Sequence, residues 1–317
     1  MTGLPITGAT APVADSTGNW VDRHAPEWSR PYLRLARFDR PIGSWLLLMP
    51  CWWAAALAAG IARDLSYLPI VCALFFIGAF VMRGAGCTWN DITDRDLDGK
   101  VERTRSRPIP SGQVTAKQAA VFMAALCLIG LAVLMQFNAF AIATGIASLI
   151  IVAAYPFMKR ITYWPQIVLG LAFSWGALMG FAVIFARLDP VAFVLYAGSI
   201  AWVVGYDTMY AHQDAEDDLL VGIKSTALLF GARTHAALSV LYGIAVTLIG
   251  AALWLAGSGW FAWIGLAVFA AHLASQIVRL DIHNSPLCLK LFKSNRDAGL
   301  LLFAGLVADA VVRTMTA

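Results

Sequence analysis

Long apolar runs, separated by short polar segments, occupy most of the sequence. About 20 apolar residues cross the hydrocarbon core of a bilayer. The runs therefore predict nine transmembrane helices, at residues 41–61, 69–90, 116–135, 138–156, 165–186, 190–211, 235–256, 259–278 and 297–315. Within each run the apolar residues are continuous and do not alternate with polar ones, which excludes a membrane barrel of β-strands. We expect an all-α polytopic membrane protein, a bundle of nine transmembrane helices.

The composition leaves room for one folded domain. Of the 317 residues, 60% are hydrophobic and 13% are charged, whereas soluble domains carry roughly 25% charged residues, so a soluble globule is excluded. Nine crossings use roughly 180 residues, and we expect a single membrane-embedded domain over residues 29–317. Residues 1–28 are polar and lack the apolar core of a signal peptide, which predicts a disordered polar tail in the cytoplasm. The five cysteines show no C-x-x-C spacing and are interpreted as small core residues.

The positively charged residues predict the orientation of the helices. If the N-terminal tail and every second connection lie on one side, 19 of the 23 Lys and Arg residues are there. Only Arg63, Arg187 and Arg313 are on the other side, and Arg83 lies within the second predicted helix. Cytoplasmic loops carry the excess of cations, so we expect the N-terminus inside the cell, the C-terminus outside, and a location in the bacterial inner membrane. The same bias explains the net charge of +4 without a nucleic-acid partner.

Ten of the 19 acidic residues fall into two short segments, each at the expected cytoplasmic end of a predicted helix. In the first segment, Asn90, Asp94 and Asp98 are four residues apart and would line one face of a continuing helix. In the second, Asp214 and Asp218 have the same spacing. A solvated loop explains one such run, but like charges four residues apart destabilise a helix, so two runs indicate a bound cation. Oxygen ligands without His or Cys favour a hard ion such as Mg²⁺.

Basic residues follow both acidic segments, Arg103 and Arg107 after the first and Lys224 after the second. Arg binds phosphate oxygens in a bidentate manner and Lys acts as a point charge, and Mg²⁺ usually completes its shell with water and substrate phosphate. Each cation taken singly is equally well explained by the charge bias of cytoplasmic loops. Together, the acids and cations indicate a diphosphate site at the cytoplasmic membrane surface, with acidic caps from two similar halves around a central cavity.

The motifs of these segments match a known family. Residues 90–98 have the form N-D-x-x-D-x-x-x-D and residues 214–218 the form D-x-x-x-D, a combination that resembles the UbiA superfamily of intramembrane aromatic prenyltransferases. Three longer strings are similar to the branch that prenylates 4-hydroxybenzoate for ubiquinone biosynthesis: GCTWNDITDRDLDGKVERTRSRPIPSG, YPFMKRITYWPQ and YDTMYAHQDAEDDLLVGIKSTALLFG. The likeness runs from about Trp28 to the C-terminus.

The resemblance implies a reaction in the bilayer. A polyprenyl diphosphate would lose its diphosphate with the help of Mg²⁺, and the ring of 4-hydroxybenzoate would attack the allylic cation ortho to its hydroxyl. The implied metal ligands are Asn90, Asp94, Asp98, Asp214 and Asp218. The implied contacts to the diphosphate or the substrates are Arg40, Arg103, Arg107, Lys159 and Lys224.

Three further residues are expected near the chemistry. Asp91 could substitute as a ligand of the first metal ion. Asp207, one heptad before Asp214 on the same acidic ladder, could orient either a Mg²⁺-bound water or the phenol. Arg160 would pair with the carboxylate of the aromatic acid, with Arg40 as a second candidate for that role. His212 could accept a proton, although an interfacial hydrogen bond is the better interpretation of this residue.

Two other classes of function stay open. Another member of the superfamily would use haem, homogentisate or a naphthoate as the acceptor, and a sequence does not display the pocket shape that decides between them. A transporter is the alternative outside the enzymes, because intramembrane acids often mark ion pathways. Here almost no ionisable residue lies within a predicted span and both acidic segments are expected on one side, which does not suit alternating access.

Overall fold

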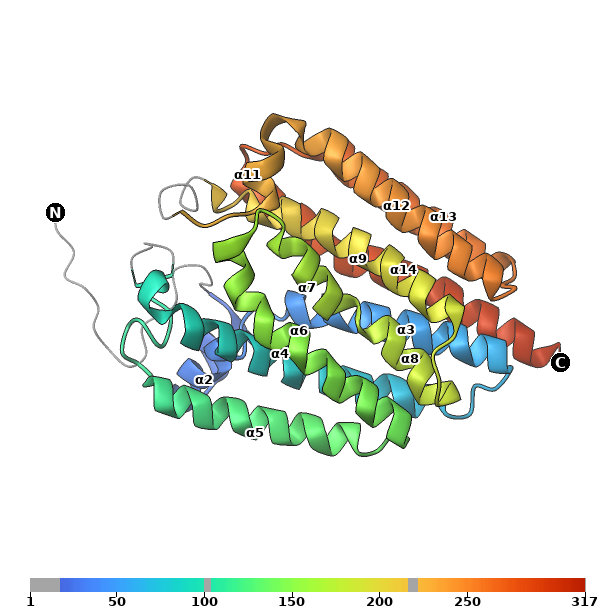
Figure 1. The fold of residues 1–317 in the computed structure, drawn as a ribbon, viewed down its shortest axis with the longest axis horizontal. Helices are drawn as coiled ribbons and strands as arrows, with labels where there is room; N and C mark the ends of the chain where they lie inside the picture. Colours follow the sequence, from blue (N-terminus) through green and yellow to red (C-terminus); the bar gives the residue numbers. More distant parts are fainter. Residues whose placement is uncertain (1–17, 100–103, 216–221, 317) are drawn as a thin grey trace. The chain divides into compact units, whose positions relative to one another are not determined.

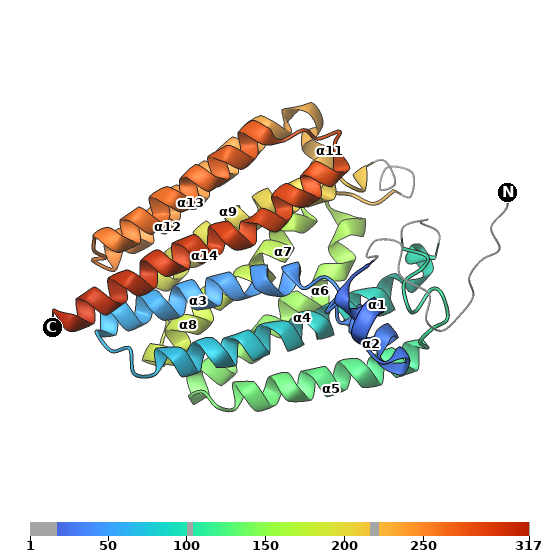
Figure 2. The same ribbon diagram turned by 180° about the vertical axis from the view of Figure 1, so that it is seen from behind.

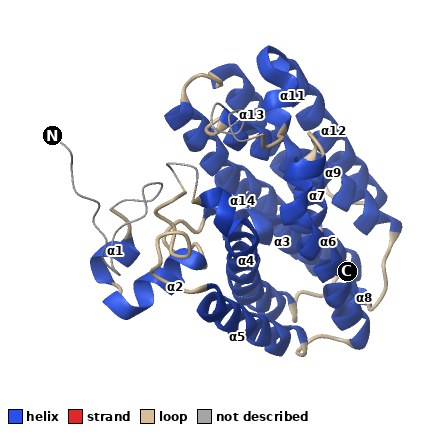
Figure 3. Cartoon of the chain, turned by 60° about the vertical axis from the view of Figure 1, so that its left-hand side comes forward, coloured by secondary structure: helices blue, strands red, loops and turns tan. Residues whose placement is uncertain are grey.

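The computed structural model describes residues 18–99, 104–215 and 222–316 (Figure 1, and from behind in Figure 2). Its α-helices are α1 (Trp20–His24), α2 (Arg30–Leu35), α3 (Ile42–Ala62), α4 (Leu68–Asp98), α5 (Ala116–Leu134), α6 (Ala139–Ile161), α7 (Pro165–Ser174), α8 (Gly176–Phe185), α9 (Pro190–Ala211), α11 (Thr226–Phe230), α12 (Thr234–Leu255), α13 (Trp260–Arg279) and α14 (Ser285–Met315). Two short 3-10 helices, η1 (Glu27–Ser29) and η2 (Gly231–Arg233), precede α2 and α12. Over these ranges the chain forms helices, turns and loops, without a strand (Figure 3).

Nine helical segments in the described ranges are long and apolar enough to cross a membrane. Each corresponds to one apolar run of the sequence, and most of the ends agree within a few residues. One segment, Pro165–Phe185, consists of α7 and α8, and another, Thr226–Leu255, begins with the short α11. The prediction of an all-α polytopic membrane protein is confirmed.

Two helices extend well beyond their apolar runs. α4 continues through the first acidic segment to Asp98, past the predicted end at residue 90. α14 begins at Ser285, ahead of the predicted start at residue 297, because the side chain of Asn284 accepts a hydrogen bond from Leu287 N at 3.0 Å and Pro286 occupies the first turn. Apolarity marks the part of a helix that crosses the bilayer, whereas capping residues mark where the helix begins.

The predicted disordered tail is wrong at its C-terminal end. Residues 1–17 lie outside the described residues, but the side chain of Asn19 caps α1, and Val21 in that helix is fully buried. Asp22 pairs with Arg34 at 2.7 Å. A polar stretch becomes ordered when a few of its residues bond to buried partners. Composition carries no information about those partners.

Contacts within the chain separate two compact units, Met1–Ser44 with Ile77–Val133 (unit 1) and Trp45–Phe76 with Leu134–Ala317 (unit 2). The sequence predicts a single domain from residue 29, whereas the contacts concentrate within these two groups. The boundaries after Ser44 and before Ile77 fall inside α3 and α4, so each of these two helices contributes residues to both units.

Unit 1 is organised around apolar contacts of α2 with α4 and α5 (Figure 2). In one cluster Leu35 packs with Val114 and Ala119, at the start of α5. In the other, Ala36 lies so close to Gly84 of α4 that a Cβ on Gly84 would be 2.9 Å from the Cβ of Ala36. The residue that follows α2 is therefore pressed against α4, and the chain between α2 and α3 must turn at this point.

α9 lies at the centre of unit 2, where it packs against α7, α8, α11, α12 and α14 (Figure 1). Three fully buried rings form the core of unit 2. The Trp53 ring of α3 lies with its centroid 4.8 Å from that of Trp202 of α9 and 5.6 Å from that of Phe269 of α13. Trp202 also donates a hydrogen bond from Nε1 to Asn295 Oδ1 of α14 at 2.9 Å. This core fixes the direction of α9, which carries the start of the second acidic segment.

Candidate active site

The first acidic segment lies on the last turns of α4 in unit 1. Because α4 runs without a break to Asp98, Asn90, Asp94 and Asp98 stand on successive turns of one face, as their spacing predicts. Asp94 is fully buried and Asp98 is 7% exposed. Arg95 and Asp96 are exposed, and their side chains lie 3.6 Å apart. α4 therefore buries Asp94 and Asp98 and leaves Asp96 in solvent.

Asp91 is the centre of a buried ion cluster in unit 1. Its Oδ1 atom accepts hydrogen bonds from Arg37 Nη2 at 2.7 Å and from Arg107 Nη1 at 3.4 Å. Arg107 Nη1 also donates to Asp98 Oδ2 at 3.0 Å, so one guanidinium serves two carboxylates. The side chain of Asp91 is fully buried, and a buried carboxylate requires such partners. Asp91 therefore orients both arginines.

Sequence reasoning selected Arg40 in this stretch and missed Arg37. Arg37 adopts a left-handed backbone conformation with φ of 59°, in the turn that follows α2. Arg40 lies beside Asp39, with Arg40 Nε 3.6 Å from Asp39 Oδ2. The string R-F-D-R places two arginines within four positions, and helical periodicity does not tell which of them bonds to Asp91, because the turn interrupts the helix.

The second acidic segment lies at the end of α9 in unit 2, and its predicted ladder is wrong in part. α9 ends at Ala211, and Asp214 follows in a turn, where its N–H donates to Ala211 O at 3.2 Å. Asp207 is still on the helix, so the two acids do not share one continuous helical face. Side chains around the break bond to nearby backbone, as Gln213 Nε2 does to Tyr210 O at 3.0 Å. Such local bonds compete with the helical hydrogen bonds.

Neutral contacts hold the second segment in place. Tyr210 packs on Phe292 of α14 with ring centroids 4.7 Å apart. The hydroxyls of Thr208 and Thr226 are 2.7 Å apart and buried, and Thr226 N donates to Gln166 Oε1 at 3.1 Å. Gln166 thereby links α7 to the start of α11. Gln166 is the last residue of the string YPFMKRITYWPQ, but sequence reasoning assigned it no role, because a single amide at the start of an apolar stretch does not indicate its partner.

His212, directly after α9, is bonded to Thr234 at the start of α12, with His212 Nε2 2.9 Å from Thr234 Oγ1. Burial lowers the pKa of His212, and the nearby His283 and His235 lower it further. The imidazole is therefore neutral at pH 7, and its hydrogen bond agrees with the structural role that the sequence favours for it.

Lys224 joins the segment before α11 to the last turn of α6 in unit 2. Its backbone N–H donates to Lys159 O at 3.0 Å, and its Nζ donates to Ile161 O at 3.1 Å. The ammonium also lies 5.4 Å from the centroid of the Tyr163 ring. The structure thus brings Lys159 and Lys224 together, and Arg160, which is exposed, lies between these contacts on the last turn of α6.

The donors of the acidic segments fit a hard divalent cation. They are carboxylate and amide oxygens, the ligands that Mg²⁺ prefers, and Asp91 Oδ2 is buried and accepts no hydrogen bond from the described residues. Within those residues, no three His, Cys, Asp or Glu side chains converge on one metal position. Two of the predicted site residues, Arg103 and Asp218, lie outside the described ranges.

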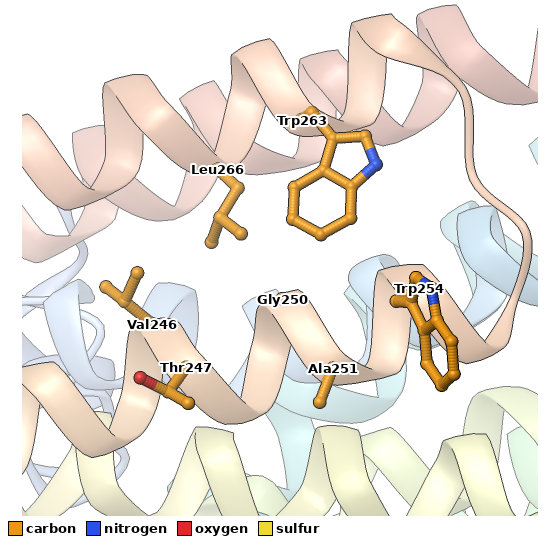
Figure 4. A pocket seen from close by; sticks show the side chains of 7 residues that line it. All are labelled: Val246, Thr247, Gly250, Ala251, Trp254, Trp263 and Leu266. Atoms are coloured by element: carbon orange, nitrogen blue, oxygen red, sulfur yellow. The ribbon is translucent and has the colours of Figure 1, made fainter.

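A hollow of about 430 Å³ lies elsewhere, between α12 and α13 of unit 2 (Figure 4). Its lining includes Val246, Gly250 and Trp254 of α12, with Leu266 and Trp263 of α13 projecting towards it from the other side. None of the predicted site residues lines it. The hollow is an apolar notch between two membrane-crossing helices and does not belong to the candidate active site.

Comparison with known proteins identifies the family. Residues 47–304 match the model of the UbiA prenyltransferase family, which accounts for most of the chain. The chain belongs to this family. The resemblance that the acidic motifs indicate is therefore confirmed.

UbiA-family relatives are similar along nearly the whole chain. The mitochondrial 4-hydroxybenzoate polyprenyltransferase of Rattus norvegicus is 49% identical over 293 residues, which are 90% of this chain and 76% of the rat protein. The protein of the same name from Homo sapiens is 46% identical over 312 residues, 96% of this chain and 80% of the human protein.

Solved structures of UbiA homologs have the same fold. The apo structure of a homolog from Aeropyrum pernix K1 has a TM-score of 0.68 at 24% identity and covers 84% of this chain and 97% of that one. A homolog from Archaeoglobus fulgidus, bound to GPP and Mg²⁺, has a TM-score of 0.65 at 21% identity and covers 89% and 99%. At these identities the likeness establishes the shared fold.

Proposed function

We propose that this UbiA-family enzyme transfers a polyprenyl group from polyprenyl diphosphate to the ring of 4-hydroxybenzoate, ortho to the hydroxyl, and releases diphosphate, as a step of ubiquinone biosynthesis. The observation that carries the proposal is an identity of 46–49%, over at least 90% of the chain, to curated relatives that bear this activity in their name. A further support is the homolog of the same fold that binds GPP and Mg²⁺.

The acidic segments are proposed to neutralise the diphosphate. Two Mg²⁺ ions would be held by Asn90, Asp94 and Asp98 and by Asp214 and Asp218. When bound, Mg²⁺ supplies positive charge that stabilises the departing diphosphate. Arg107 is proposed to contact the diphosphate from its place 3.0 Å from Asp98, with Arg103 as a second cation. Asp91 keeps the Arg107 guanidinium oriented and is assigned a positioning role.

The aromatic acid requires a cation for its carboxylate. Arg160 is exposed on the last turn of α6, and we assign it to this carboxylate, with Arg40 as the second candidate. Asp207 is assigned to orient the phenol. Lys159 and Lys224 are assigned to the diphosphate, and for Lys224 this contact would replace its hydrogen bond to Ile161 O.

Both units are proposed to form one prenyltransferase domain, since α3 and α4 run through both of them. The bias of 19 of 23 cations supports an N-terminus and an active site on the cytoplasmic face. The location in the bacterial inner membrane is a proposal from the sequence, whereas the relatives named above are mitochondrial proteins. In a mitochondrion the corresponding face would be that of the matrix.

The test is product formation by the purified protein in lipid vesicles. With Mg²⁺, a radiolabelled polyprenyl diphosphate and 4-hydroxybenzoate, we expect a prenylated acid and one diphosphate for each product, loss of both with EDTA, and recovery on adding Mg²⁺. Homogentisate, a naphthoate and haem in parallel reactions test the alternative acceptors, and ion flux in the same vesicles tests a transporter. Product with another acceptor alone would change the proposed substrate, and full turnover in EDTA would contradict the metal dependence.

A further inference from the structure

The short helix α1 contacts both sides of the turn that presents Arg37. On one side, Asp22 Oδ1 accepts a hydrogen bond from Arg34 Nη2 at 2.7 Å. On the other, Trp20 Nε1 donates to Phe38 O at 2.7 Å. Arg37 lies between these two anchored residues, so α1 holds the side chain of Arg34 before it and the backbone of Phe38 after it.

The anchored turn holds a conformation that Arg37 would not adopt by itself. A φ of 59° is unfavourable for a residue with a side chain. The turn is closed by Phe38 N, which donates to Leu33 O at 2.9 Å. In this conformation Arg37 Nη1 donates to Arg34 O at 2.8 Å, while Nη2 reaches Asp91 Oδ1 at 2.7 Å. One guanidinium thus bridges its own turn and the first acidic segment.

The contact of Asp22 with Arg34 is buried, unlike the ion pair of Glu27 with Arg30. Only 2% of the Arg34 side chain and 15% of the Asp22 side chain are exposed, and Arg34 Nη1 also donates to Gln113 Oε1 at 3.3 Å. The pair of Glu27 with Arg30 is long, at 3.9 Å, and 74% of the Glu27 side chain is exposed. Buried charge pairs have a much larger effect when one partner is removed than exposed pairs do.

We propose that α1 is a positioning element of the first metal segment, in which Trp20 and Asp22 keep Arg37 on Asp91 and thereby leave Arg107 shared with Asp98. The inference rests on the proposed function, in which this segment binds a Mg²⁺–diphosphate pair. If α1 releases the turn, Asp91 loses its closer partner and draws Arg107 from 3.4 Å into a tighter bond. Arg107 then moves away from Asp98 and from the diphosphate.

The proposal predicts different effects on the KM for polyprenyl diphosphate and on the affinity for Mn²⁺. Loss of one charge-assisted hydrogen bond to the diphosphate should raise the KM for polyprenyl diphosphate about tenfold. Asp98 is at the same time relieved of a competing cation, so Mn²⁺ alone should bind at least as tightly as to the wild type. A variant that only loosens the fold would weaken both.

The test compares two pairs of matched variants of the full chain. Asp22→Asn removes the buried charge pair and Glu27→Gln removes the exposed one, while Trp20→Phe removes the bonded indole N–H and Trp28→Phe changes a ring that is 78% exposed. We expect a tenfold higher KM in Asp22→Asn and Trp20→Phe and wild-type values in the other two. Mn²⁺ binding followed by EPR should not weaken in any of the four.

Two further variants show whether the effect passes through Arg37. Asp22→Glu keeps the carboxylate and should restore most of the wild-type KM. Arg37→Gln should raise the KM as much alone as together with Asp22→Asn, because both changes break the same link. A wild-type KM in Asp22→Asn and Trp20→Phe, or additive effects with Arg37→Gln, overturns the inference. So does a parallel weakening of Mn²⁺ binding.

Failure of the proposed function gives a different result. In that case the wild type forms no prenylated product, and binding of inorganic diphosphate in the presence of Mn²⁺ replaces the KM as the measurement. Weaker diphosphate binding in Asp22→Asn and Trp20→Phe then still supports the positioning role, and unchanged binding contradicts it.

Discussion

The acidic segment on α4 and the one at the end of α9 carry similar carboxylates, but different groups hold them. Behind the first lies a buried cluster of charges, in which Asp91 and Asp98 share the guanidinium of Arg107. Behind the second lie rings and hydroxyls, such as the Tyr210 and Phe292 rings and the bonded pair Thr208 and Thr226. Among these contacts, those at the first segment are ionic hydrogen bonds and those at the second are neutral.

This difference determines how a substitution among the residues that contact each segment affects substrate binding and stability. Removal of one partner of a buried ion pair leaves an uncompensated charge, which typically costs about 3–5 kcal/mol and rearranges the other partners. Removal of a neutral hydrogen bond costs only about 1 kcal/mol. We therefore expect changes behind the first segment to alter substrate binding, and changes behind the second to lower stability slightly.

The largest expected effect tests whether the two segments serve one reaction in spite of their different surroundings. Asp94→Ala and Asp214→Ala each remove a proposed metal ligand, and each should lower the rate of prenyl transfer by about 10²–10³. The double variant should lose much less than the product of the two factors, because groups that act as one unit are not additive.

The control for this pair is Asp64→Ala, which removes an exposed carboxylate between α3 and α4 that accepts a hydrogen bond from Ser66 N. It should keep the wild-type rate. A rate near that of the wild type in Asp94→Ala or Asp214→Ala would remove that residue from the metal site and make the segments unequal in function as well as in packing.

An intermediate effect is expected for the ionic cluster alone. Arg107→Gln removes the guanidinium that Asp91 and Asp98 share, and it should raise the KM for polyprenyl diphosphate by about 10- to 100-fold, the value of one charge-assisted hydrogen bond. Arg105→Gln, two residues away on an exposed side chain, is the matched control and should change the KM less than threefold. Equal effects of the two variants would mean that general positive charge matters here and that the cluster geometry does not.

The smallest effect should appear behind the second segment. Thr208→Val removes the hydroxyl that lies 2.7 Å from that of Thr226, and the loss of one buried neutral hydrogen bond should lower the melting temperature by about 2–4 °C. The KM and the rate should stay within twofold of the wild type. Ser199→Ala, which removes a buried hydroxyl bonded only within α9, to Leu195 O, is the control and should lower the melting temperature less. A large loss of activity in Thr208→Val at an unchanged melting temperature would contradict the comparison.

Much of the site was predictable where local sequence sets the geometry. The spacing of Asn90, Asp94 and Asp98 is sufficient to place them on one face, because α4 continues through them. The same argument fails at the second segment, where the helix ends at Ala211 and separates Asp207 from Asp214. The spacing is similar in both cases, and the side-chain bonds at the helix end make the difference.

Arg37 shows a second limit of sequence reasoning. Its role depends on a left-handed turn, and that turn depends on α1, whose residues fall in a stretch that its polar composition marks as disordered. Trp20 and Asp22 act through contacts with residues 18 and 12 positions away in the chain. No periodic pattern connects residues at such distances.

The sequence by itself determined the class of the protein, the number and approximate ends of the membrane-crossing helices, and the oxygen-rich segments that carry the chemistry. Apolar length and residue spacing are local properties, and a bilayer and an α-helix convert them directly into structure. The tertiary structure decided which arginine reaches Asp91, where α9 ends, and that Lys224 bonds to the last turn of α6. These outcomes follow from the pairing of buried polar groups, and a buried charge or N–H takes whichever partner the packed helices bring within reach.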